Sequence, residues 1–160
     1  MTSPDEAFDT FDLKILRTLG ARGSLKNVDL ADAVGLSPSA CHQRTARLKK
    51  LGVLKGFTAD IDIAKVTPVI RVLTLVMLEK QDISQFQIIN NRLPDIPQIV
   101  RAHRTSGDFD YAFETVAPDF DAYLLILKRL VEGVEIKQYQ SRIMQEVLKI
   151  GNATGVLEDR

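Results

Sequence analysis

The sequence of 160 residues predicts an α+β protein, with an N-terminal three-helix helix-turn-helix domain followed by a βαββαβ ferredoxin-like domain. Two observations support this fold class. Apolar residues recur at helical spacing through residues 8–54, whereas after Pro68 strand-like and helical segments follow one another in the order βαββαβ. The expected parts are the helix-turn-helix domain at 1–54, a hinge strand or linker at 55–68, the ferredoxin-like domain at 69–150 and a loose tail at 151–160.

The composition is that of a soluble globular protein, with 45% hydrophobic and 26% charged residues. No apolar run is long enough to cross a bilayer, so we expect no membrane association. The acidic N-terminal stretch lacks the pattern of a signal peptide, and one cysteine cannot form an internal disulfide, so we expect a cytoplasmic protein. Acidic and basic residues balance at 21 each, which means that only a local patch of charge could indicate nucleic acid as a partner.

The first helix is expected over the stretch FDTFDLKILRTLG, whose apolar residues fall on one helical face. Asp9 or Thr10 can cap its N-terminus, and the carboxylate of Asp12 lies favourably in the first turn. Gly20 is expected to end the helix.

Two further helices are expected to form the helix-turn-helix proper. The second is short, covers residues 27–34, and ends at Gly35, where a left-handed cap favours glycine. After a sharp turn, Ser37 caps the third helix and Pro38 takes its first position, where a missing amide hydrogen costs nothing. The third helix runs to about Leu51.

The second domain is expected to follow a strand-like hinge at 55–63. Its order places two helices on one face of a four-stranded antiparallel sheet. The expected strands are 69–78, 98–105, 110–117 and 134–149, and the expected helices are 84–93 and 118–131.

Strand 69–78 is apolar on both of its alternating sides, with Leu73 and Leu75 on one side and Val72 and Val76 on the other. Both faces should therefore be buried. Since the two helices can cover only one face, we expect a second copy of the sheet to cover the other, in a homodimer or larger assembly. The alternative is that the N-terminal helices fold back over that face.

The third helix carries an uncompensated basic face, because no acidic residue occurs between Ala33 and Ala59. A helical projection puts Cys41 on the inward face and polar and cationic side chains on the opposite face, without a large apolar residue. Such a face suits the major groove of double-stranded DNA, and the alternative is a solvated surface. The candidate DNA-binding residues are Ser37, Ser39, His42, Gln43, Arg44, Arg47 and Lys50.

Within this set the expected roles differ. Ser39, His42, Gln43 and Arg47 are the candidates for reading base edges. Arg44 projects near the edge of the core, so we expect it to contact phosphate or the protein backbone.

Three segments resemble the Lrp/AsnC family of transcription regulators: LKILRTL, VDLADAVGLSPSACHQRTARLKKLGVLKGFTADID and TSGDFDYAFETVAPDFDAY. The resemblance runs from about Phe8 to Lys149. It implies an N-terminal DNA-binding domain, a hinge strand, and a regulatory domain that dimerises through its sheets and often assembles into tetramers or octamers. One departure is Lys26, where the family usually has a capping serine or threonine. Either Asn27 takes over the cap or the second helix begins later.

The turn in TSGDFDY can present backbone amides beside a carboxylate, which suits the two charged ends of an amino acid. A plain hairpin turn is the alternative from the residues alone. The resemblance implies a small-molecule effector, an amino acid or related metabolite, near this turn at a subunit interface. The candidate effector-binding residues are Thr105, Gly107, Asp108, Asp110 and Tyr111, joined by Gln138 and Gln140 on the last strand, where the family often has threonines.

The sequence gives little support to catalysis, and we expect no catalytic residue, metal site or cofactor. Cys41 is expected in the core, His42 on the DNA-facing helix, and His103 far from any metal-ligand spacing. The alternatives to a regulator are an enzyme like siroheme decarboxylase, whose subunits resemble this family and act on a tetrapyrrole, and a metabolite sensor that has lost DNA binding.

Overall fold

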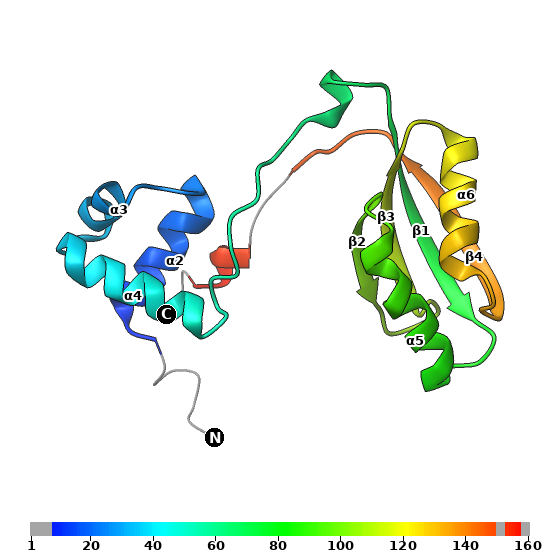
Figure 1. The fold of residues 1–160 in the computed structure, drawn as a ribbon, viewed down its shortest axis with the longest axis horizontal. Coiled ribbons are helices and arrows are strands. Elements are labelled where there is room, and N and C mark those ends of the chain that lie inside the picture. Colours follow the sequence, from blue (N-terminus) through cyan, green and yellow to red (C-terminus); the bar gives the residue numbers. More distant parts are fainter. Residues whose placement is uncertain (1–7, 150–152, 158–160) are drawn as a thin grey trace. The chain divides into compact units, whose positions relative to one another are not determined.

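The structure is a computed structural model that describes residues 8–149 and 153–157. It divides into two compact units, one holding the chain up to Asp60 together with the segment from Lys149 onward, and one holding Ile61–Leu148. The first unit is helical, and the second combines a sheet with helices (Figure 1). The predicted α+β class is therefore confirmed. The ends of the predicted tail, 151–152 and 158–160, lie outside the described residues.

The helical unit contains the predicted helices α2 (Thr10–Arg22), α3 (Asn27–Val34) and α4 (Pro38–Lys50). Each has a narrow apolar face, and the faces meet in one core. Cys41 is fully buried there, as predicted. The buried members of the core are Ile15, Leu19, Leu30, Ala31, Val34, Cys41 and Leu48.

Helix α2 begins as predicted but ends later. The carboxylate of Asp9 accepts a hydrogen bond from the Asp12 amide at 2.9 Å, and the Asp12 carboxylate accepts from the Asp9 amide at 3.4 Å, a reciprocal cap. The predicted end at Gly20 is wrong, because α2 continues to Arg22 and the chain turns at Gly23 with φ of 73°. A single glycine within a helix costs only about 1 kcal/mol, whereas a positive φ strongly favours glycine.

Helix α3 begins at Asn27, and neither alternative for its cap is correct. Lys26 occupies the cap position without a side-chain hydrogen bond. The Asn27 amide instead donates to the carbonyl oxygen of Pro38 at 2.7 Å. Asn27 therefore ties the start of α3 to the start of α4, across the turn of the helix-turn-helix.

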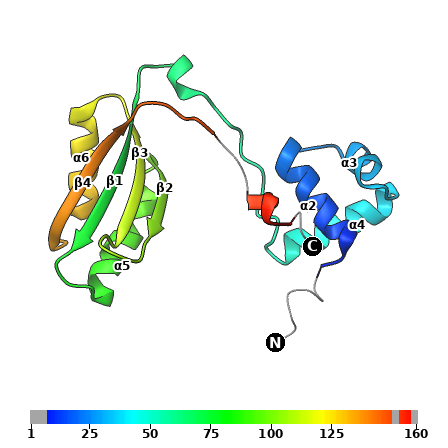
Figure 2. The same cartoon turned by 180° about the vertical axis from the view of Figure 1, so that it is seen from behind.

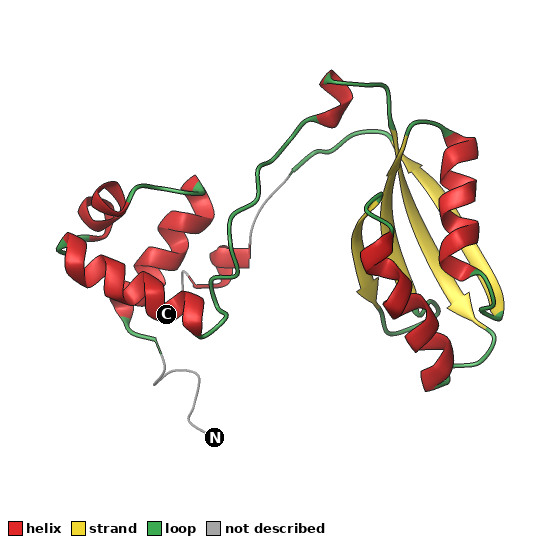
Figure 3. Ribbon diagram, viewed as in Figure 1, coloured by secondary structure: helices red, strands yellow, loops and turns green. Residues whose placement is uncertain are grey.

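The hinge strand predicted at 55–63 is absent from the described chain. Residues 55–62 have no regular structure, and Ile63–Lys65 form one short helical turn, η1 (Figure 3). An extended segment becomes a strand only when a neighbouring strand completes its hydrogen bonds. No such neighbour lies beside residues 55–62 in the described part of this single chain.

The second unit has the predicted βαββαβ order. It consists of β1 (Ile70–Leu78), α5 (Ile83–Arg92), the short turn η2 (Leu93–Asp95), β2 (Ile99–Arg104), β3 (Tyr111–Ala117), α6 (Phe120–Val131) and β4 (Ile136–Met144). The strands pair antiparallel in the order β2-β3-β1-β4. Figure 2 shows α5 and α6 behind the sheet, on one face. The last strand is shorter than the predicted 134–149.

The two faces of this sheet differ. On the face that α5 and α6 cover, Val72 and Val76 are fully buried. The opposite face, called here the outer face, carries Leu73, Leu75 and Met77, which are half-buried. The two-sided apolar character of β1 is thus a feature of the folded unit, whose described helices α5 and α6 both lie on the other side of the sheet (Figure 2).

The tail was expected to be loose, yet residues Ala153–Leu157 form a short helix, η3. It contacts α2 within the helical unit. Thr154 and Leu157 are half-buried there.

Candidate DNA-binding helix and effector turn

Helix α4 presents a polar, carboxylate-free face to solvent. The hydroxyl of Ser37 accepts from the Ala40 amide at 3.3 Å and caps the helix, and Pro38 follows at the first position. Since Cys41 and Leu48 are fully buried, the opposite side of the helix must face outward. The exposed residues on that side are Ser39, His42, Gln43, Ala46 and Lys50.

The two arginines of α4 bind carboxylates of α2. Arg44 donates to Asp9 at 2.7 Å and to Asp12 at 3.0 Å, and Arg47 donates to the other oxygen of Asp12 at 3.0 Å. The side chain of Asp12 is only 3% exposed, whereas those of Arg44 and Arg47 are 32% and 48% exposed. A buried carboxylate needs such partners, so this contact, called here the Asp12 clamp, fixes α4 against α2.

The ion pairs of the Asp12 clamp stabilise the charged forms of Asp9 and Arg44. The Asp12 amide, followed by the Arg44 guanidinium, holds the pKa of the Asp9 carboxyl below its usual range. Hydrogen bonds from Arg44 to Asp9 and Asp12 raise the pKa of its guanidinium. This role of Asp12 was not predicted from the sequence, because its two arginine partners lie 32 and 35 residues further along the chain.

The Asp12 clamp changes what is expected of Arg47. Arg47 bonds Asp12 through one terminal nitrogen, so a contact to a guanine would have to use its other donors while the ion pair limits where the guanidinium can reach. The base-edge candidates that carry no such ion pair in the described structure are Ser39, His42 and Gln43.

The turn between β2 and β3 is closed by its own side chains. The hydroxyl of Thr105 donates to the carbonyl oxygen of Phe109, and the Thr105 amide donates to the carbonyl oxygen of Asp110 at 3.0 Å. Gly107 has φ of 104°, which other residues rarely adopt. Asp108 is exposed, so its carboxylate is accessible to a ligand.

Asp110 is buried and engaged within the fold, in contrast to its predicted place at an open site. One of its carboxylate oxygens accepts from the Leu78 amide at 2.8 Å, and the other accepts from the Gln81 side chain at 2.7 Å. Since β1 ends at Leu78 and β3 begins at Tyr111, Asp110 joins the ends of the two central strands.

The other effector candidates lie on opposite faces of the sheet. Tyr111 is 1% exposed in the core beneath α5, where its hydroxyl donates to Asn90 at 3.0 Å and burial raises its pKa. Gln138 and Gln140 lie on the outer face, because they pair across the strands with Met77 and Leu75. One ligand therefore cannot contact Tyr111 together with the two glutamines. The sequence alone did not reveal that these residues lie on opposite faces, because it does not say which side of each strand faces the helices.

A groove of about 510 Å³, which the sequence did not indicate, lies between α6 and β4. Its lining residues are Val76, Leu124, Leu127, Lys128, Val131, Ile136, Lys137, Gln138 and Tyr139. It lies on the same face of the sheet as α6. The groove is apolar, and no carboxylate is among its lining residues.

Within the described residues, no group of histidine, cysteine and acidic side chains is arranged to hold a metal ion. No helix in that part of the chain is long and apolar enough to cross a membrane. His42 is exposed on α4, and His103 is exposed on β2, next to Ala112 of β3 on the outer face.

Two family models match the chain. One, described as winged helix-turn-helix DNA-binding, matches residues 8–55 and so covers α2 to α4. The other, described as the Lrp/AsnC ligand binding domain, matches residues 71–154 and covers the sheet and its helices.

Curated relatives match along nearly the whole chain. The leucine-responsive regulatory proteins of Klebsiella pneumoniae and Escherichia coli (strain K12) are each 30% identical over 150 residues, which is 93% of this chain and 92% of theirs. The protein of the same name from Haemophilus influenzae is 33% identical over 123 residues, covering 77% of this chain and 74% of its own.

Solved structures share the fold. An AsnC family transcriptional regulator from Agrobacterium tumefaciens has a TM-score of 0.79 at 31% identity, covering 90% of this chain and 94% of its own. A transcriptional regulator from Neisseria meningitidis, solved in complex with L-Met, has a TM-score of 0.80 at 23% identity, covering 92% of this chain and 96% of its own.

The buried carboxylate of Asp110 yields a prediction about stability. Asp110→Asn replaces a buried carboxylate that accepts two charge-assisted hydrogen bonds by a neutral amide with one oxygen, so we expect the free energy of unfolding to fall by about 1–3 kcal/mol. In the matched variant Asp108→Asn, which changes an exposed side chain, the change should stay within about 0.5 kcal/mol. Urea unfolding followed by circular dichroism measures both, and equal stabilities would show that Asp110 is not a structural link.

Proposed function

Because the chain belongs to the Lrp/AsnC family of transcriptional regulators, we propose that it binds double-stranded DNA through α4 and changes its DNA affinity when an amino acid binds its C-terminal unit. The observation that carries the proposal is the exposed face of α4, which bears hydroxyl, imidazole, amide and ammonium groups and no carboxylate. Such a face complements the acceptors and phosphates of a DNA groove.

We assign different roles in DNA binding to the side chains of α4. Ser39, His42 and Gln43 lie in its N-terminal half, the part of a recognition helix that approaches base edges. Lys50 lies at its end and suits a phosphate contact. Arg44 and Arg47 hold α4 in place through the Asp12 clamp and add positive potential near the DNA backbone.

The amino-acid site is assigned to the turn at Gly107 and Asp108 and the adjacent end of the outer face at Gln138. The backbone of the turn supplies amide donors for a carboxylate, and exposed Asp108 supplies an acceptor for an ammonium group. Gln138 lies at the same end of the sheet, beside Met77. The Neisseria meningitidis regulator with L-Met indicates that this fold accommodates an amino acid.

The assembly is proposed to be a homodimer, able to associate further, in which a second copy covers the outer face. Leu73, Leu75 and Met77 form an apolar stripe there, on the side of the sheet away from α5 and α6. The linker supports the same conclusion, because Phe57 and Ile61 are 43% and 63% exposed in a segment without strand partners in the described chain. A partner chain would supply both missing neighbours.

An enzymatic role is not proposed, since the relatives are named as regulators and the exposed face of α4 is polar and free of carboxylates. His103 and Arg101 on β2 are the residues that a siroheme decarboxylase-like enzyme would have available for a carboxylated ring. Incubation with a carboxylated tetrapyrrole should leave its carboxylates intact. Loss of a carboxylate would favour the enzyme.

The first prediction concerns base reading. Replacing Gln43 by alanine should remove a base contact, weaken binding to the preferred site by about 1–3 kcal/mol and relax the preference at one base pair of each half-site. Arg47→Gln should weaken binding to all site variants by a similar factor, because it loosens α4 without removing a base contact. Fluorescence anisotropy on a panel of single-base variants measures both. A base-specific loss in Arg47→Gln alone would return the reading role to Arg47.

The second prediction concerns the effector. Asp108→Asn should keep the fold and the DNA affinity while weakening the amino acid's binding by about 1.5–3 kcal/mol, the value of a charged hydrogen bond. Calorimetric titration of the amino acids against wild type and Asp108→Asn measures this, with Asp121→Asn on α6 as the matched control. By linkage, DNA must alter the effector's affinity as much as the effector alters the DNA affinity. Equal binding to all three proteins would place the effector site elsewhere.

The third prediction concerns assembly. Leu73→Lys places a charge on the outer face and should dissociate the dimer into folded monomers. Leu125, 69% exposed on α6, provides the control, and Leu125→Lys should leave association unchanged. Light scattering with circular dichroism distinguishes dissociation from unfolding. A wild type that is monomeric at micromolar concentration would contradict the proposal.

A further inference from the structure

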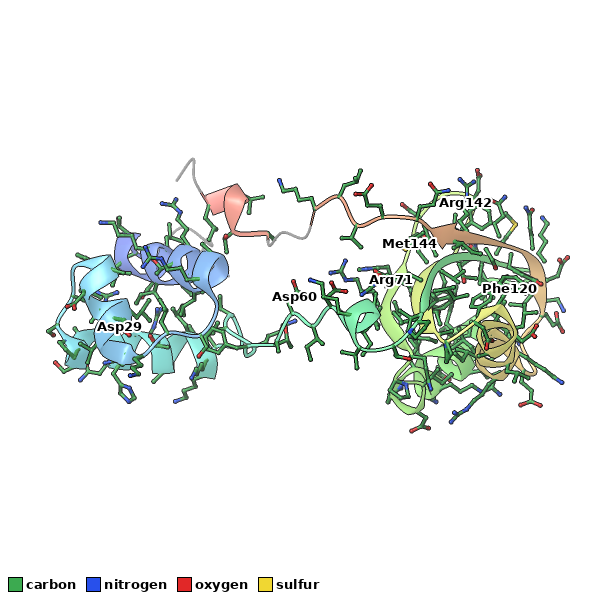
Figure 4. The ribbon with its side chains drawn as sticks, turned by 90° about the horizontal axis from the view of Figure 1, so that it is seen from above. Asp29, Asp60, Arg71, Phe120, Arg142 and Met144 are labelled. Carbon is green, nitrogen blue, oxygen red and sulfur yellow. The ribbon has the colours of Figure 1, made fainter. Side chains whose placement is uncertain are left out.

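The outer face carries charged residues from all four strands. Arg101 of β2 pairs with Glu114 of β3, which pairs with Leu73 of β1, which pairs with Arg142 of β4. Arg71 lies two residues before Leu73 on the same side of β1, so it is diagonal to both Glu114 and Arg142. Figure 4 labels Arg71 and Arg142 on these neighbouring strands.

The charges on this face do not balance. Glu114, whose side chain is 15% exposed, contacts Arg71 at 3.2 Å and Arg101 at 3.7 Å. It is the one carboxylate among the outer-face positions of the four described strands, which also hold Arg142. The three arginines therefore exceed the acids by two charges.

Arg142 has the least satisfied guanidinium of the three. Its hydrogen bond to another side chain goes to the amide oxygen of Gln140, at 3.3 Å. No carboxylate in the described chain lies within ion-pair distance of it. A guanidinium offers five donors in a planar fork, so most of the donors of Arg142 are open to a ligand.

Arg71 and Arg142 lie close enough to share one anion. Diagonal neighbours on adjacent antiparallel strands are about 7–8 Å apart, within reach of two long side chains. Like charges at this separation repel, and an anion between them removes the repulsion. Two guanidinium forks match the oxygens of a carboxylate or phosphate group, each able to donate two parallel hydrogen bonds.

We propose that Arg71 and Arg142, with Gln140 beside them, form a binding site for a small oxyanion, a carboxylate or phosphate group, on the outer face of the sheet. The site is distinct from the proposed effector turn, because Gln138 and Arg142 are four residues, about 13 Å, apart along β4. The effect of a bound anion on association depends on the proposed dimer. If a second copy covers the outer face, the excess arginines of both copies are buried together, and the bound anion offsets their repulsion.

The test uses inorganic phosphate and citrate as probes, at constant ionic strength against sodium chloride, with the full chain. Nuclear magnetic resonance of the arginine side chains and calorimetry measure binding. Wild type should bind phosphate, citrate or both, with shifts at Arg142, and Arg142→Gln should bind at least tenfold more weakly. Arg129→Gln, a change on the exposed side of α6, should bind as wild type does. Binding of phosphate alone would identify a phosphate site, and binding of citrate alone a carboxylate site.

Sedimentation equilibrium adds a second measurement, and it separates this proposal from that of the dimer. The probe anion should tighten wild-type association severalfold and leave that of Arg142→Gln unchanged. A dimer that forms equally well with and without the anions, together with equal anion binding by wild type and Arg142→Gln, would overturn the site and leave the dimer standing. Arg142-dependent binding by a protein that remains monomeric would retain the site and remove the dimer. A variant that fails to fold, judged by circular dichroism, is replaced by Arg142→Lys, which keeps the charge, loses the fork and should still bind more weakly.

Discussion

The carboxylate of Asp12, buried between two arginines of α4, is the contact on which the DNA-facing part of the molecule depends. A helical unit of this size has a small apolar core and is correspondingly marginal in stability. The Asp12 clamp adds directional bonds to that core and so fixes the rotation of α4 as well as its position. That rotation decides which side chains face outward. The polar face of α4 is therefore a consequence of what Cys41, Leu48 and Asp12 hold inward.

The C-terminal unit uses a buried carboxylate in a comparable way. Asp110 joins the ends of the two central strands, directly beside the turn proposed to bind the effector. The exposed Asp108 is proposed to bind the ligand, whereas the buried Asp110 is bonded within the fold. A ligand that moves the turn acts on a segment anchored to β1. Since β1 also contributes Leu73, Leu75 and Met77 to the outer face, the proposed effector turn and the proposed assembly surface both contact this strand.

The sequence predicted the fold class and most elements because periodicity and caps are local. It also predicted the exposed side of α4, since an inward Cys41 fixes the opposite face. It could not predict the partners of Arg47 and Asp110, because these pairings join segments more than 25 residues apart. The hinge strand was not found for a related reason. A strand at 55–62 requires a neighbouring strand, which the described single chain does not provide. Tyr111 was an effector candidate through the family resemblance, and its burial could not be foreseen because strand alternation does not reveal which side is inner.

The central claim is that α4 reads a DNA sequence under the control of an amino acid. The most direct measurement is selection of DNA fragments from a randomised pool by the purified full chain, repeated with each amino acid and at two salt concentrations. The account predicts a palindromic motif with half-sites about one helical turn apart, binding that weakens steeply with salt, and an amino acid that changes the enrichment. Enrichment of no motif under any condition would contradict it.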